Sequence, residues 1–368
     1  MFTSELWNGA TSGFTIDQSI RFNSGDSTYM QRTHGAGGNV DLFTVSFWFK
    51  RSGLGEEVHM FGSGANTSNT SDLMFKTDDT LQFYSYIGAY QTRLITNQVF
   101  RDPSAWYHCV VVYDSANSTS GDRAKLYING QRVTSFSTET YPSQNQDGIV
   151  GSNVNIGFGR YIANASSYFN GYLAEMHYVN GQALTPDSFG ETNDSGIWIP
   201  KKYSGSHGTG GFHVDGRDAS DLGDDESGNG NDLTTSGLAA HDQVLDSPTN
   251  NFCTINSVYA DASAINNVTL TEGNLKATGT SSAFDIKGMT FNLPKSGKWY
   301  FEYTIGGLYD GFGFIIAGQE ASITSSNGIG QVSSSQGGGI QYQGWIQGAS
   351  YTVNFGATFT SGHIHQVA

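Results

Sequence analysis

The feature that most constrains the fold of this sequence is an alternation of apolar and polar residues with a period of two. Successive side chains of a β-strand point to opposite faces, so this period predicts half-buried strands. Helical periodicity is nearly absent; only residues 185–189 suggest a short helical turn, with Thr185 as N-cap and Pro186 in its first position. The chain is therefore predicted to be all-β. The clearest alternating run is Phe43, Val45, Phe47 and Phe49.

Turn residues predict two hairpins. The apolar runs at 73–75 and 81–84 are separated by a polar turn cluster. Asn129-Gly130 follows another alternating run, and this dipeptide favours a two-residue hairpin turn because both residues tolerate positive φ.

Two longer strands are also expected. Residues 106–113 are almost continuously apolar, which is typical of a strand in the middle of a sheet. Residues 172–179 form the second, and simple alternation predicts one shared face for Tyr172, Ala174, Met176 and Tyr178.

A length of 368 residues predicts two or three domains. Between about residues 200 and 250 the sequence becomes rich in Gly, Asp, Ser and Asn and keeps only scattered apolar anchors. We expect an N-terminal arm at 1–16, a first sandwich at 17–197, an ordered connector at 198–254 and a second sandwich at 255–368.

Charge and composition exclude several classes of protein. The net charge of −15 argues against nucleic-acid binding, which needs a basic surface. The sequence contains no run of about 18 apolar residues, so membrane insertion is not expected. The first ten residues lack the features of a secretory signal. Charged residues make up only 14%, which leaves a neutral polar surface typical of lectins, adhesins and virus particles. Cys109 and Cys253 are expected to be free thiols.

Several segments, in the correct order, resemble the laminin-G-like, concanavalin A-like lectin superfamily. They are the strands at 43–49 and 106–113, the hairpin start at 126–130, and the closing strand and turn at 171–186. The resemblance covers about residues 16–195. It implies an antiparallel jelly-roll, concanavalin-like β-sandwich.

Residues 210–232 and 246–252 resemble the connector that follows such domains in structural proteins of marine tailed phages, cyanophages especially. This resemblance implies a protein made in the host cytoplasm and carried on the exterior of the virion. Other virion proteins would be its partners. Phage fibres usually trimerise, so a homotrimer is expected by analogy.

The last region resembles the opening half of a SPRY (B30.2-like) domain. Residues 297–303 correspond to its entry strand, 311–314 to a following strand, and 362–368 to its Gly-Asp-x-Ile strand, with His363 in place of Asp. A SPRY domain would continue with further strands. We therefore expect a partial sandwich, either truncated or completed by another chain.

Catalysis needs a separate test because the concanavalin-like fold includes glycan hydrolases. Retaining members need paired carboxylates on one face of a strand, whereas Glu175 and Glu302 each stand alone in their strands. His363 and His365 share a strand face but have no adjacent third metal ligand. No enzyme activity is expected.

Ca²⁺ is the one cofactor that the laminin-G-like resemblance implies, held at the sandwich rim by carboxylate and carbonyl oxygens. Asp114 and Asp122 flank the loop after the central strand, and the polar loop at 225–232 offers Asp225, Asn229 and Asn231. The alternative for this loop, which we favour, is a series of Asx-turns whose side chains cap their own backbone.

Tyr141, Tyr161 and Tyr168 lie in predicted loops, where they could stack on sugar rings or fill the loop cores. The leading hypothesis is a non-catalytic phage virion protein, a tail fibre, spike or capsid-surface fibre, which attaches to host-surface polysaccharide. One alternative is an extracellular polysaccharide-degrading enzyme, disfavoured by the missing carboxylate pair. The other is a secreted bacterial adhesin, disfavoured by the missing signal.

Overall fold

The computed structural model describes residues 13–35, 37–258, 268–279, 289–291, 301–304, 311–315, 337–341, 345–348, 351–354 and 364–367. The chain divides into two compact units, one of Thr3–Phe252 and one of Cys253–Ala368 with Met1–Phe2. Of the predicted arm, residues 1–12 lie outside the described residues.

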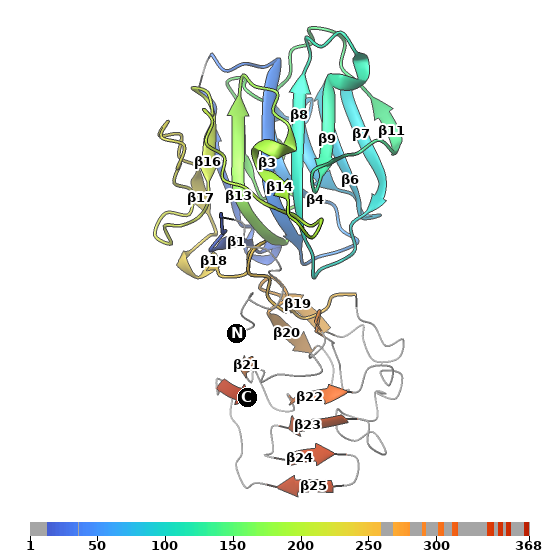
Figure 1. Cartoon of the computed structure of the whole chain (residues 1–368), viewed down its shortest axis with the longest axis vertical. Coiled ribbons are helices and arrows are strands. Elements are labelled where there is room, and N and C mark those ends of the chain that lie inside the picture. Colours follow the sequence, from blue (N-terminus) through green and yellow to red (C-terminus); the bar gives the residue numbers. More distant parts are fainter. Residues whose placement is uncertain are drawn as a thin grey trace. The chain divides into compact units, whose positions relative to one another are not determined.

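The first unit is a sandwich of two antiparallel sheets, as expected for an all-β chain (Figure 1). Sheet A has the order β10-β9-β8-β3-β13-β1-β18, with β16 also paired to β13, and sheet B has the order β11-β7-β6-β5-β4-β12-β2-β17. The strands of sheet A are β1 (Ser19–Phe22), β3 (Leu42–Arg51), β8 (Trp106–Asp114), β9 (Ala124–Ile128), β10 (Gln131–Arg132), β13 (Gly171–Asn180), β16 (Phe212–Val214) and β18 (Gln243–Val244). Those of sheet B are β2 (Tyr29–Thr33), β4 (Val58–Asn66), β5 (Asn69–Phe75), β6 (Thr80–Ile87), β7 (Tyr90–Val99), β11 (Phe136–Thr140), β12 (Asn155–Phe158) and β17 (Thr234–Ser236).

Short elements lie between the strands of the two sheets. β14 (Gly190–Thr192) pairs with β15 (Trp198–Pro200) outside both sheets. The helical turn expected near residue 186 is present as η4 (Pro186–Ser188), with Thr185 at its N-cap. The other 3₁₀ turns are η2 (Ser24–Asp26), η3 (Ser120–Asp122) and η5 (Ala240–Asp242).

The core lies between the inner faces of the two sheets. Phe47 of β3 packs edge-on against Phe158 of β12 with ring centroids 5.6 Å apart, and Phe158 also contacts Phe61 of β4. Cys109 is a buried free thiol in the same core, and Cys253 is also free. Burying these large rings is the main driving force for closing the sandwich.

The predicted hairpins are confirmed. β5 and β6 pair around the expected turn, and β9 and β10 pair around Asn129-Gly130, whose φ values are 48° and 76°. β8 lies between β3 and β9, which confirms its predicted place inside a sheet. The prediction that β3 is half-buried was wrong, since Phe43–Arg51 are buried on both faces. The segments that precede β1 and follow β13 in the sequence cover the outer face of sheet A.

The predicted shared face of β13 was also wrong. A β-bulge interrupts the pairing of β13 with β3 between Ala174 and His177. Simple alternation fails at such an extra residue. Met176 and Tyr178 therefore lie in the main core, whereas Ala174 packs in a separate cluster on the outer face with Ile16 and Trp48.

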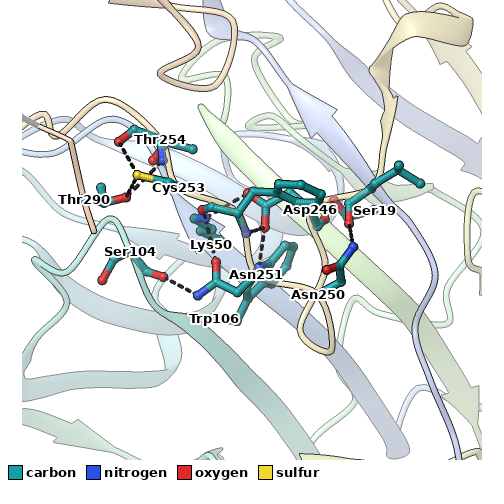
Figure 2. Close-up of polar contacts among 12 residues, drawn as sticks. Ser19, Lys50, Ser104, Trp106, Asp246, Asn250, Asn251, Cys253, Thr254 and Thr290 are labelled. Atoms are coloured by element: carbon teal, nitrogen blue, oxygen red, sulfur yellow. Dashed lines mark hydrogen bonds and ion pairs between the residues drawn. The ribbon is translucent and has the colours of Figure 1, made fainter. Parts of the chain in front are cut away.

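Residues 198–252 belong to the first unit and supply edge strands to both of its sheets. β16 pairs with β13, β17 with β2, and β18 with β1. Beyond β18, Asp246 forms a buried ion pair with Lys50 of β3 (Figure 2). The Gly/Asp-rich segment is thus an integral part of this sandwich.

The second unit is described in shorter pieces, most of them strands. β19 (Val268–Thr271) pairs with β20 (Lys276–Gly279), and β21 (Phe301–Thr304) with β26 (Ile364–Val367). β22 (Gly311–Ile315), β23 (Gly337–Gln341), β24 (Trp345–Gly348) and β25 (Tyr351–Asn354) form a four-stranded meander. Much of the predicted SPRY-like region, including His363, lies outside the described residues. Within the described part of the chain, no helix is long and apolar enough to cross a bilayer.

Candidate functional site

A row of residues crosses the outer face of sheet B, the face turned away from the core. Asp72 of β5 lies opposite Gly62 of β4 and opposite Tyr84 of β6. Directly paired residues point to the same side of a sheet, so the row forms one surface. From β17 to β11 it consists of Thr234, Gln31, Gly157, Gly62, Asp72, Tyr84, Arg93 and Thr140.

His59 and Asp72 form a buried pair at the centre of this face. Nδ1 of His59 lies 3.1 Å from Oδ1 of Asp72, and Oγ1 of Thr70 donates a 2.6 Å hydrogen bond to Oδ2. Nε2 of His59 faces the exposed carboxylate of Glu57 at 3.8 Å. Because Asp72 is fully buried and has these partners, its carboxylate is held in one position.

The ionisable groups around His59 shift one another's pKa values. Burial alone would lower the pKa of His59, but hydrogen bonds and attraction from Asp72 and Glu57 outweigh it, so the pKa is raised. The hydrogen bond with His59 in turn lowers the pKa of Glu57. Burial and the nearby Asp72 charge raise the pKa of Tyr84, which keeps its hydroxyl protonated. The face therefore presents fixed donors and acceptors beside aromatic rings.

The loop at 159–170 places two tyrosines on the same face. The ring of Tyr161 stacks on His59 with centroids 4.5 Å apart. The backbone N–H of His59 donates to the carbonyl of Ser167, next to Tyr168. Phe169 is fully buried and anchors the end of the loop in the core. Because the loop is anchored in this way, the rings of Tyr161 and Tyr168 are held in place at the surface.

Gly62 makes room for the Asp72 carboxylate. A Cβ atom there would lie only 2.6 Å from Oδ1 of Asp72, whereas its 3.6 Å distance from Ile162 of the loop would be an ordinary van der Waals contact. A side chain at this position would therefore displace the Asp72 carboxylate.

Two arginines lie over tyrosine rings on either side of the central pair. The guanidinium of Arg160 is 3.6 Å from the ring centroid of Tyr29, and that of Arg93 is 4.3 Å from the centroid of Tyr90. Stacking of this kind fixes the planar cation while its edge stays available for hydrogen bonds. The ring centroids of Tyr29 and Tyr168 lie 6.4 Å apart, so the Arg160–Tyr29 stack lies next to the loop at 159–170.

A hollow of about 250 Å³ opens beside Tyr29 at the β2 side of the sheet. Among the described residues, Nε of Arg160 and Nη1 of Arg32 are buried without a hydrogen-bond partner, and of these two side chains only Arg32 lines the hollow. The hollow is lined by Tyr29, Gln31, Arg32, Thr33, Asn155, Thr234 and Thr235.

The three predicted glycan-binding tyrosines are thus divided between two places. Tyr161 and Tyr168 lie together on the outer face of sheet B. Tyr141 follows β11 and packs against the main core, with its hydroxyl bonded to Glu139. Contact of any of the three with a sugar stays a prediction.

The first pair of predicted Ca²⁺ ligands has protein partners. Oδ2 of Asp114 accepts a hydrogen bond from Asn117, and Oδ1 of Asp122 lies 2.7 Å from Nη1 of Arg132. Ca²⁺ binding by Asp114 and Asp122 stays a prediction.

In the loop at 225–232, the side chains bond to nearby backbone. Asp225 accepts hydrogen bonds from the backbone N–H groups of His213, Ser227 and Asn231. The side-chain amides of Asn229 and Asn231 donate to the carbonyl of Gly211. Asp225 thus forms the Asx-turn that we favoured for this loop, whereas the Asn229 and Asn231 amides bond to another segment. These bonds occupy the oxygens of Asp225, and Ca²⁺ binding in this loop stays a prediction.

No local sequence pattern identifies His59, Asp72, Tyr84 or Arg93. They lie on four different strands, and only the strand register brings them to one face. The alternation around each residue predicts which face it occupies, but no spacing in the sequence predicts that they lie close together.

Residues 23–188 match the family model of the concanavalin A-like lectin/glucanases superfamily, in its laminin G form. This confirms the laminin-G-like resemblance of the first sandwich. A comparison with curated protein sequences gave no match.

Several solved structures are similar to part of the chain. A heptameric SAP-like pentraxin from Limulus polyphemus has 16% identity and a TM-score of 0.36, over 47% of this chain and 80% of its own. Domain 4 of the extracellular GH43 arabinanase AbnA from Geobacillus stearothermophilus, in complex with arabinotriose, has 18% identity and a TM-score of 0.31, over 40% and 65%. Domains LG4-5 of the mouse laminin alpha1 chain have 12% identity and a TM-score of 0.34, over 56% and 48%. These values support no statement about ligand or activity.

Proposed function

We propose that the laminin-G-like sandwich is a carbohydrate-binding module and that the outer face of sheet B is its binding surface. The observation that carries this proposal is the set of pre-positioned tyrosines and arginines around the buried His59–Asp72 pair. Sugar rings have apolar C–H faces that pack on aromatic rings and hydroxyls that need fixed donors and acceptors. Residues 23–188 match the model of a family that includes lectins and glucanases.

Binding without catalysis is part of the proposal. A retaining hydrolase needs one carboxylate free to attack and a second to donate a proton. Asp72, the central carboxylate of the face, is fully buried and bonded to Thr70 and His59. Asp72 is therefore inaccessible as a nucleophile, and it holds His59 and Thr70 in position.

The biological setting that we propose is the exterior of a phage particle, where the chain would act in attachment to host-surface polysaccharide. Its support is the resemblance of residues 210–232 and 246–252 to connectors of phage structural proteins, together with the neutral polar composition. A homotrimer and a SPRY-like second unit belong to the same proposal. A portal or tail gene beside the gene for this chain, and a trimeric mass in solution, would support this setting. A monomeric mass would contradict the trimer.

Glycan binding is tested with the full chain on an array of bacterial lipopolysaccharides and exopolysaccharides. Y161A removes the ring stacked on His59 and R93A removes the cation over Tyr90, so each should weaken binding by about fivefold, since one such contact contributes about 1 kcal/mol. Y127A is the matched control because Tyr127 lies on β9 of the other sheet.

Two results would contradict the proposal. One is a folded wild-type chain that binds no glycan on the array, and the other is binding that Y161A and R93A leave unchanged. Reducing ends released from a bound polysaccharide would instead show that the chain is an enzyme.

A further inference from the structure

A second group of functional side chains lies on the outer face of sheet A, away from the proposed glycan surface. Glu175 and His177 belong to β13, and His213 belongs to β16, which pairs beside it. One donor atom from each of the three lies within 4.8 Å of the others. Oε2 of Glu175 is 3.3 Å from Nε2 of His177 and 3.1 Å from Nε2 of His213. We call these three residues the Glu175 cluster.

The bulge in β13 creates this cluster. Glu175 is the extra residue of the bulge and has φ of 49°, a conformation that favours glycine over glutamate. The strained position puts the Glu175 carboxylate on the same side of the sheet as the His177 ring. Strain of this kind persists where the surroundings fix it, and it occurs often at ligand sites.

His207 supports the cluster from the neighbouring loop. Its Nε2 lies 3.1 Å from Nδ1 of His177, and the rings of His177 and His213 stack with centroids 4.0 Å apart. The Asp225 carboxylate fixes the start of β16 by accepting from the backbone N–H of His213. The ring nitrogen of His177 that faces away from Glu175 therefore has a partner that sets its tautomer.

We propose that Glu175, His177 and His213 form a binding site for a zinc-class divalent transition metal, with His207 as a positioning residue. Two imidazole nitrogens and one carboxylate oxygen are a common ligand set for zinc. When Nε2 of His177 binds a cation, its proton can reside on Nδ1 and point to His207. This change of tautomer needs no movement of either ring.

Three protein ligands leave a coordination position for water or a small ligand. The gap that Glu175 and His177 line together with Ser46, Trp48 and Lys201 is too narrow to hold a water molecule. A fourth ligand is therefore not accommodated in that gap.

The test is titration of the full chain with Zn²⁺ and, separately, Co²⁺ after removal of metals by a chelator. The histidine pair near the C-terminus is replaced (H363A/H365A) so that it does not contribute. We expect saturable binding of one ion per chain and a Co²⁺ absorption spectrum typical of four-coordinate nitrogen and oxygen ligands. H213A and E175Q should abolish saturable binding, and H207A should weaken it by about 10- to 100-fold.

H241A is the matched control because the side chain of His241 is 71% exposed and lies on η5; it should bind like the parent. Circular dichroism checks that each variant is folded. A folded parent that binds no Zn²⁺ saturably would overturn the proposal, as would unchanged binding in folded H213A and E175Q. If H213A or E175Q does not fold, H177N and H213Q take its place under the same criteria.

Discussion

The ion pair between Lys50 and Asp246 is buried, with 0% and 7% of the two side chains exposed. Nζ of Lys50 donates three hydrogen bonds of 2.8 Å each, to Oδ2 of Asp246, Oδ1 of Asn251 and the carbonyl of Phe252 (Figure 2). An ammonium has three N–H donors, so each of them has a partner. Changing Lys50 to methionine should therefore expose the cost of a buried carboxylate that has lost its counter-charge.

The expected cost of K50M is about 3–5 kcal/mol in the free energy of unfolding of the first unit. D246N leaves the lysine charge with neutral partners and keeps an oxygen for Nε1 of Trp106, which now donates to Oδ1 at 2.9 Å. Its cost should be about 2–4 kcal/mol. The double variant K50M/D246N buries no charge and loses only neutral hydrogen bonds, so about 1–3 kcal/mol is expected. The two changes are then coupled by at least about 2 kcal/mol.

The assay is urea unfolding of the full chain at pH 7, followed by tryptophan fluorescence. R217M is the control, since the Arg217 partner of Asp215 is 57% exposed and its loss should cost less than about 1 kcal/mol. The reasoning fails if the double variant costs as much as the two single variants together. It also fails if K50M unfolds within about 1 kcal/mol of the parent chain.

Two further predictions concern other buried polar groups. Burial lowers the pKa of His108 to about 3, so the unfolded chain binds a proton there at a pH where the folded chain does not. This difference in proton binding leaves the free energy of unfolding unaffected above about pH 6.5 and lowers it as the pH falls toward 3, by up to about 1.4 kcal/mol per pH unit. H108Q should therefore flatten the pH dependence of urea unfolding. An unchanged pH dependence in this variant would refute the prediction. G62A adds a methyl group 2.6 Å from Oδ1 of Asp72 and should cost about 1–3 kcal/mol and weaken glycan binding. G25A, where the nearest atom is 3.4 Å away, should leave melting temperature and glycan binding as in the parent; equal melting temperatures for both variants would contradict the close-packing argument.

Much of the fold could be predicted because local signals agree with it. The alternation at β3 and the Asn129-Gly130 turn each act over a few residues, so the sequence alone indicates them. The order of laminin-G-like segments then indicates how those strands assemble, and the match at residues 23–188 bears this out.

The errors come from effects that no local pattern contains. The bulge at Glu175 shifts the side-chain alternation of β13 by one residue, and its sequence carries no glycine to mark it. His207 and His213 lie in the segment predicted to be an ordered connector, and no local pattern indicates that pairing of β16 with β13 brings them beside His177. Both sites therefore depend on register between distant strands.

The edge strands supplied by residues 212–244 also have a consequence for synthesis on the ribosome. β1 is among the first strands made, but its partner β18 and the acceptors of the Lys50 ammonium follow more than 190 residues later. At about 5–20 residues per second, translation from residue 197 to residue 252 takes roughly 3–11 s. During that interval the nascent sandwich has two open sheet edges and a lysine without its counter-charge. A chaperone that shields exposed strands would be needed most in this window, and a gene fragment ending at residue 197 would keep the protein in that state permanently.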